Sequence, residues 1–233
     1  NEEFEELGIK EKAEVLPEEI HLLSQKAFKQ RFPQSKSDRF FSPMDQVVYS
    51  ASSVRGVEKN RLALFHAIFH ESIHLVSARR YRLHNLNDRE KLVVSYRTGY
   101  GTFGFLRGTL EHFKGFDEAV VDKIVLDSLV KHKDEFVREF DIKKHELNLA
   151  APYYYWGNME ILDKIIKKIG EKNDENEDVV WKRFKKGLFT GEMAHLRDIE
   201  KTFGDGALRV VAALGSSTGL GSSTKKQTKK YLN

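Results

Sequence analysis

The sequence predicts an α+β protein in which a small mixed sheet and two long helices precede a helical C-terminal region. Short runs rich in β-branched and aromatic residues, bounded by turn residues, fall in the first half of the chain. Apolar residues at three- and four-residue steps predict two helices in the same half. From about residue 136 onward the predicted elements are almost all helices. We therefore expect a mixed α+β region over residues 1–135 and a helical region over 136–214. A Gly/Ser/Thr-rich, basic and disordered tail is expected over 215–233.

Two segments near the N-terminus predict the first strands. Residues 18–32 (EEIHLLSQKAFKQRF) predict a short strand that runs into a short helix. Residues 39–52 (RFFSPMDQVVYSAS) contain two apolar-rich runs, which are separated by Ser-Pro-Met-Asp. Proline and aspartate between two such runs are typical of a turn, so this segment predicts a β-hairpin.

A long amphipathic helix is expected next, from Val57 to about Arg80. The segment contains neither proline nor glycine. Its apolar residues recur at helical spacing: Leu62, Phe65, Phe69, Ile73 and Val76. Such a stripe buries one face of a helix against a core. Residues 91–106 then predict a second hairpin, and residues 116–130 predict a second helix.

A GxGxxG pattern over residues 99–104 (GYGTFG) is a possible phosphate-binding loop. A dinucleotide site requires a helix that begins at the last glycine, and the following FLRGTL predicts none. We favour a glycine-containing hairpin. Further along, residues 158–170 predict a helix that ends at Gly170, followed by a polar loop at 171–178 and more short helices up to 214.

Composition narrows the function classes. The 233 residues include 40% hydrophobic residues and 16 Phe, which is enough for a core, and no Cys, which excludes disulfides and thiolate metal sites. No apolar run approaches the ~18 residues of a membrane span. The net charge of +4 comes largely from the tail, so we do not expect nucleic acid as a partner. The absence of cysteine and of a signal-like N-terminus favours a cytoplasmic location, whereas the oligomeric state is not predicted.

The chemistry-bearing motif is HExxH, at His70-Glu71-Ser72-Ile73-His74. Residues four apart share one helix face, so both imidazoles can reach one tetrahedral zinc ion. Glu71 lies one position round the helix and can take a proton from a zinc-bound water. Two buried core histidines are the competing interpretation of this helix.

A catalytic zinc ion needs a third protein ligand. In the pattern HExxHxxGxxH, Ser77 stands in the place of the glycine and Arg80 in the place of the third histidine, so that pattern fails. Glu118, in the second helix, can supply the ligand, and Asp122 one turn later can accept the free ring N–H of His70. A solvated helix face is the alternative for this pair.

Other histidines are weaker candidates. We expect His66 to be a core or rim residue, and His84 to be solvated in a polar loop. His112 stays an alternative ligand because it lies near the start of the Glu118 helix. His132, His145 and His195 have no ligand spacing and are expected at the surface.

HESIH followed by FDEAVVD resembles the gluzincin metallopeptidases, whose thermolysin-like members carry HExxH and then NEAxxD. Asp117 stands where the family often has Asn. Residues 40–52 (FFSPMDQVVYSAS) and 96–103 (YRTGYGTF) also resemble the edge hairpin and the inter-helix segment of the minigluzincins. The resemblance implies a zincin-like catalytic domain, built from a small mixed sheet, an active-site helix and a glutamate helix. It implies a zinc metalloendopeptidase that binds extended peptide beside the edge strand, and it does not cover residues beyond about 136.

Peptide hydrolysis also needs a donor for the tetrahedral oxyanion. Tyr100 is our candidate, with Tyr96, Arg97 and the run 153–155 (YYY) as alternatives and simple aromatic packing as the competing explanation. The predicted function is zinc-dependent hydrolysis of a peptide or protein substrate, with Zn²⁺ held by His70, His74 and Glu118. The alternative is a catalytically silent zinc-containing module that recruits a protein or nucleic-acid partner.

Overall fold

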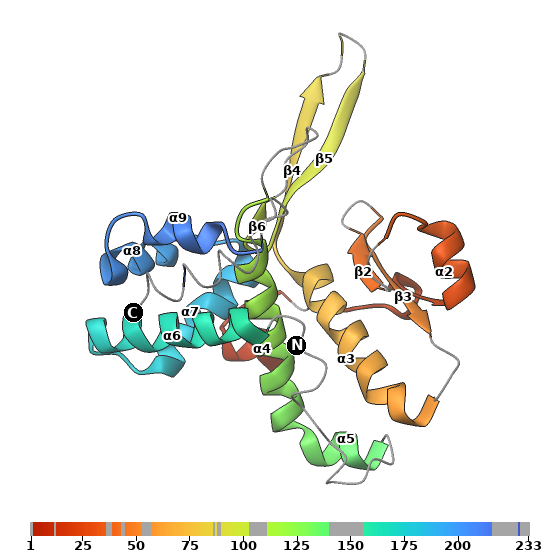
Figure 1. Cartoon of the computed structure of the whole chain (residues 1–233), viewed down its shortest axis with the longest axis horizontal. Helices are drawn as coiled ribbons and strands as arrows, with labels where there is room; N and C mark the ends of the chain where they lie inside the picture. Colours follow the sequence, from red (N-terminus) through yellow and green to blue (C-terminus); the bar gives the residue numbers. More distant parts are fainter. Residues whose placement is uncertain are drawn as a thin grey trace. The chain divides into compact units, whose positions relative to one another are not determined.

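The chain has an α+β fold with two separate three-stranded sheets (Figure 1). The computed structural model describes the backbone of residues 2–11, 13–35, 39–42, 45–52, 57–85, 87, 90–102, 111–139, 156–215 and 228, without the side chains of 52, 57–63 and 156. Its contacts divide into two compact units. Unit 1 comprises Asn1–Ala13, Ser77–Val120 and Tyr155–Asn233, and unit 2 comprises Glu14–Val76 and Val121–Tyr154.

Unit 2 contains the first sheet, with the strand order β1-β3-β2. Strand β1 (Ile20–Ser24) pairs in parallel with β3 (Val47–Ser52), and β2 (Arg39–Ser42) pairs with β3 in antiparallel register. A 3₁₀ turn (Pro17–Glu19) precedes β1, and helix α2 (Gln25–Arg31) follows it. The predicted strand–helix segment and the first predicted hairpin are both confirmed.

Aromatic packing holds this small sheet against α2. Phe28 is fully buried and Tyr49 nearly so, while Phe40 lies opposite Tyr49 across the β2–β3 pair. The rings of Phe28, Phe32, Phe40 and Tyr49 contact one another at centroid distances between 4.8 and 6.1 Å. Burial of these rings stabilises the packing of α2 on the sheet, because each ring removes a large apolar area from water.

Helix α3 (Val57–Val76) contacts β2 and β3 of unit 2. The expectation that this helix reaches Arg80 was wrong. It ends at Val76, and residues from Arg79 onward form a strand instead. The Ala78 N–H donates to the Leu188 carbonyl and the Ala78 carbonyl accepts from the Gly99 N–H, so tertiary hydrogen bonds replace the helical ones after Ser77.

Helix α4 (Lys114–Lys131) is the second predicted helix, and α5 (Lys133–Glu139) follows it. Buried residues occur all round α4, and Val120, Val121 and Asp122 are buried in succession. Its buried apolar residues are Phe116, Ala119, Val120, Val121, Ile124, Val125 and Leu129. The helix is continuous from the end of unit 1 into unit 2, so the spacing of its side chains is fixed by helical geometry alone.

Unit 1 contains the second sheet, with the strand order β4-β5-β6. Strands β4 (Arg79–Asn85) and β5 (Lys91–Thr98) form a long antiparallel ribbon, and β6 (Gly101–Thr102) adds a short strand to β5. Strand β4 was not predicted. Its His84, which was expected in a solvated loop, is a half-buried strand residue.

The turn between β5 and β6 explains the first glycine of the GYGTFG pattern. Gly99 has φ +54°, and a Cβ atom there would lie 2.3 Å from Asp117 Oδ1. Only glycine fits both conditions. The predicted hairpin is therefore present as far as Thr102, and the prediction for residues 103–106 lies outside the described residues.

The remaining helices of unit 1 are packed around a second core. They are α1 (Glu2–Glu6), α6 (Trp156–Asn173), α7 (Glu177–Thr190), the 3₁₀ turn Ala194–Leu196, α8 (Arg197–Phe203) and α9 (Ala207–Ala212). Leu162, Ile165, Leu188, Ile199 and Val211 are completely buried in this core. No helix among the described residues is long and apolar enough to cross a membrane.

Gly170 does not end its helix, contrary to the sequence prediction. Helix α6 continues to Asn173, and the polar connection shortens to residues 174–176. A Cβ at Gly170 would lie 2.9 Å from the Glu175 carbonyl oxygen. The glycine is therefore explained by the close return of the chain rather than by a helix cap. The expected disordered tail lies, except for residues 215 and 228, outside the described residues.

Candidate metal centre

Helix α3 places His70 and His74 on one face, one turn apart. The two residues are 6% and 8% exposed, and their Nε2 atoms lie 3.2 Å apart. The i, i+4 spacing predicts that the two imidazoles lie on one helix face, and this position allows both to bind one metal ion.

Asp122 fixes the orientation of His70. The Nδ1–H of His70 donates to Asp122 Oδ1 at 2.8 Å, and Asp122 is 2% exposed. A ring that donates from Nδ1 keeps the lone pair on Nε2, the atom that faces His74. The sequence predicted this carboxylate–histidine pair, and the structure contains it.

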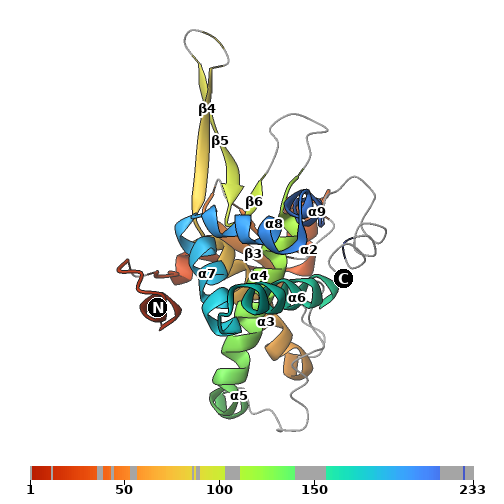
Figure 2. The same cartoon turned by 90° about the vertical axis from the view of Figure 1, so that its left-hand side faces the viewer.

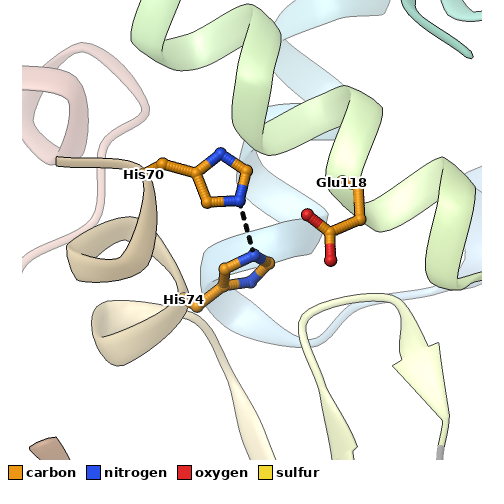
Figure 3. A group of neighbouring side chains, drawn as sticks. All are labelled: His70, His74 and Glu118. Carbon is orange, nitrogen blue, oxygen red and sulfur yellow. Dashed lines mark hydrogen bonds between the residues drawn. The ribbon is translucent and has the colours of Figure 1, made fainter. Parts of the chain in front are cut away.

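Glu118 lies one helical turn before Asp122 on α4. Its carboxylate and the ring nitrogens of His70 and His74 lie within 4.8 Å of one another, and we call these three residues the metal group (Figure 3). Figure 3 shows the carboxylate directed toward the two imidazoles. Two short segments of sequence, 44 positions apart, thus bring three potential ligand atoms to one place.

The donor set fits zinc. Two nitrogen ligands at ~2.0–2.1 Å from a tetrahedral zinc ion lie about 3.3 Å apart, close to the 3.2 Å between the two Nε2 atoms. Two histidines with one glutamate are also a known ligand set of catalytic zinc sites, which keep the fourth position for water or substrate. The residues present could therefore hold this ion without rearrangement of the histidine pair.

Glu71, next to His70, is held by strand β2. Its Oε2 accepts a hydrogen bond of 2.8 Å from the Phe41 N–H, and its Oε1 lies 4.0 Å from Arg39 Nε. Because β2 stands at the edge of its sheet, this N–H is available to a side chain rather than to a further strand. The sequence did not predict these two contacts, because no spacing rule links residues 39–41 to residue 71.

His66, one turn before His70, is 1% exposed. Its expected place in the core is confirmed. Burial lowers the pKa of its imidazole to about 4, with the Asp122 carboxylate opposing and the His70 ring and Arg39 adding to that effect. His66 is therefore neutral at pH 7. His112, the alternative ligand, is an exposed residue that forms a β-bridge with Thr102.

Tyr100 is placed differently from what its predicted role requires. The residue is completely buried, its hydroxyl donates to the Phe184 carbonyl at 2.7 Å, and the same oxygen lies 2.7 Å from His195 Nε2. Its backbone N–H donates to Asp117 Oδ1. We call Tyr100, Asp117, Phe184 and His195 the Tyr100 cluster. These contacts account for the hydroxyl without a role at the metal group.

The other residues considered for oxyanion stabilisation are also placed. Tyr96 lies on β5 beneath the Arg82 guanidinium at 4.5 Å, and Arg97 donates to the Gly191 carbonyl. The tyrosines at 153–155 lie outside the described residues. His195, expected at the surface, is instead half-buried within the Tyr100 cluster, and burial lowers its pKa to about 4. Its spacing from Tyr100 in the sequence contains no signal of this pairing.

Comparisons with known proteins leave the site to be judged on its own geometry. No protein-family model, curated protein or solved structure matches this chain.

Proposed function

We propose that the protein is a zinc-dependent metalloendopeptidase of the gluzincin type, with a zincin-like catalytic region. The observation that carries the proposal is the convergence of His70, His74 and Glu118, with Asp122 bonded to His70. A ligand set alone is compatible with a structural zinc site. The general base expected for hydrolysis, Glu71, is the neighbour of a ligand and is 9% exposed, which supports a catalytic site.

Zinc at this site would supply Lewis acidity, which lowers the pKa of a coordinated water and polarises a carbonyl group. Glu71 then performs the proton transfers. Its carboxylate accepts a proton from the attacking water and returns that proton to the amine of the cleaved peptide bond. Asp122 keeps the His70 ring in one tautomer throughout.

The contact between Glu71 and Phe41 bears on the substrate class. Glu71 lies against the main chain of an edge strand, so an extended peptide that lines up along β2 would present its scissile bond near this carboxylate. A peptide or protein substrate therefore agrees with the position of the base. Side-chain preference is not part of the proposal.

Substitution of Glu71 by Gln tests the function. The amide keeps the size of the side chain but cannot accept the proton, so zinc content should stay at one ion per chain while hydrolysis of a peptide library falls by roughly 10²–10⁴-fold. Glu135→Gln, an exposed change on α5, is the matched control and should leave both quantities unaltered.

Two results would contradict the proposal. Hydrolysis that persists in the Glu71→Gln protein would exclude the mechanism. An X-ray fluorescence scan without a zinc edge, on wild-type protein supplied with zinc, would exclude the metal centre itself. Because zinc content and cleavage are measured separately, a zinc-binding but inactive wild type would indicate the binding module instead.

A further inference from the structure

In unit 1, β4 and β5 form a two-stranded ribbon with mostly exposed or half-buried residues, which we call the β4–β5 ribbon. It extends away from the helices of unit 1 in both views (Figures 1 and 2). Strand β4 stands at the edge of the sheet, with β5 as its neighbour. An edge strand of seven residues presents main-chain N–H and C=O groups that can pair with another extended chain.

One face of the ribbon is apolar and exposed. Leu83 and Val93 lie directly opposite each other in the β4–β5 register, and Tyr81 lies two residues before Leu83 on the same face. Their exposed fractions are 58% for Leu83, 47% for Val93 and 41% for Tyr81. Three large apolar side chains grouped on a two-stranded ribbon form a patch that burial would stabilise.

The ribbon is also strongly basic. Its two strands contain five cationic residues and no aspartate or glutamate: Arg79, Arg80, Arg82, Lys91 and Arg97. Arg82 projects to the opposite face from Leu83, where it lies over the Tyr96 ring. Two such ribbons would repel each other, so this charge opposes pairing between copies of the chain and attracts an acidic chain.

We propose that the β4–β5 ribbon is a docking site for an extended, acidic segment of a partner protein. The segment adds as a strand along the outer edge of β4, its apolar side chains cover Tyr81, Leu83 and Val93, and its carboxylates pair with the exposed arginines of β4. A nucleic-acid duplex would use the charge but neither the strand edge nor the apolar face. The inference does not depend on the metal group.

Fluorescence anisotropy with a labelled peptide of about ten residues, alternating Asp and Val, tests the proposal, since that length matches a strand. Wild-type protein should bind this peptide at least roughly tenfold more tightly than an alternating Lys–Val peptide or a duplex DNA. The double change Leu83→Ser with Val93→Ser, and separately Arg80→Glu, should each weaken binding by roughly tenfold.

Matched controls lie on α7. Val179 is as exposed as Val93, at 47%, and Lys182 is an exposed cation, so Val179→Ser and Lys182→Glu should leave binding unchanged. Hydrogen exchange of the β4 amides should slow when the Asp–Val peptide is added. Equal loss in the control variants, failure of the Asp–Val peptide to bind wild type, or tighter binding of DNA would each overturn the proposal.

Discussion

The metal group and the Tyr100 cluster both contain histidine and a carboxylate, yet they are organised differently. In the Tyr100 cluster donors meet acceptors: the Tyr100 hydroxyl donates to a carbonyl, and Asp117 accepts from a main-chain N–H. In the metal group two imidazole nitrogens and a carboxylate converge on one place. Convergence of lone pairs is what a cation requires, whereas donor–acceptor matching is what a folded core requires.

A histidine that is held by a hydrogen bond away from solvent is not by itself a metal ligand. His195 and His70 are both held by an oxygen atom at hydrogen-bond distance. Only His70 has a second ring nitrogen directed at another potential ligand. Changes in the metal group should therefore alter zinc affinity, and changes in the Tyr100 cluster should alter stability alone.

The largest expected effect is on a ligand. His74→Ala should lower zinc affinity by more than about 100-fold, because loss of a ligand exceeds the loss caused by removal of an outer partner. Zinc competition with a chromogenic chelator measures this, and circular dichroism checks the fold. His132→Ala, which changes a half-buried histidine elsewhere, is the control. Unchanged affinity in His74→Ala would remove the distinction between the two clusters.

Asp122→Ala should have the next largest effect. Without the hydrogen bond to Nδ1, the His70 ring loses its fixed tautomer, and zinc affinity should fall by about 10–100-fold. Asp127→Ala, on the same helix but half-exposed, should have no such effect. A purely structural role for Asp122 would instead lower the stability of the metal-free protein and leave zinc affinity unaltered.

The pH dependence of stability sharpens the description of the Tyr100 cluster. Burial lowers the pKa of His195 in the folded state to about 4, below its ordinary value of 6.5. As pH falls, the unfolded chain takes up this proton first, so the contribution to stability is complete above pH 6.5 and is lost toward pH 4. Between pH 7 and 5 the loss should be roughly 1–2 kcal/mol after allowance for partial exposure.

Urea unfolding at the two pH values measures this loss. The His195→Gln protein should show a smaller decrease than wild type between pH 7 and 5, because it lacks the titrating ring. His66 also has a pKa lowered to about 4 and contributes to acid sensitivity in both proteins, so only the difference reports on His195. Equal decreases in the two proteins would contradict a buried, neutral His195.

Tyr100→Phe should have the smallest effect. Removal of the hydroxyl deprives the Phe184 carbonyl of a donor in a buried place, which should cost about 1 kcal/mol of unfolding free energy. Zinc affinity and peptide hydrolysis should remain at wild-type values. A large loss of hydrolysis with intact zinc binding would restore Tyr100 to the catalytic role that its sequence position suggested.

Local patterns predicted the elements that depend on local physics. The sequence predicted the helices α3 and α4. The i, i+4 spacings of His70 with His74 and of Glu118 with Asp122 are geometric properties of a helix. The grouping of the metal-site residues was therefore predictable from two short motifs. Strand β4 was not, because its arginine-rich sequence has little strand character and its conformation depends on pairing with β5.

Contacts between distant segments were the other failure. The link between His195 and Tyr100 spans 95 positions, and the hydrogen bond from the Phe41 N–H to Glu71 spans 30. Neither follows from propensity or periodicity. The sequence therefore predicts a feature that one element carries alone, and it does not predict a contact that needs a partner from elsewhere in the chain.

The hydrogen bond to Glu71 has a consequence for protein engineering. Its donor is the main-chain N–H of Phe41, so every residue except proline at position 41 can supply it. A scan of side chains at this position would leave the bond intact while it alters the surface beside the carboxylate. Residue 41 is thus a place where the lining of the proposed cleavage site can be redesigned without loss of the hydrogen bond that holds Glu71.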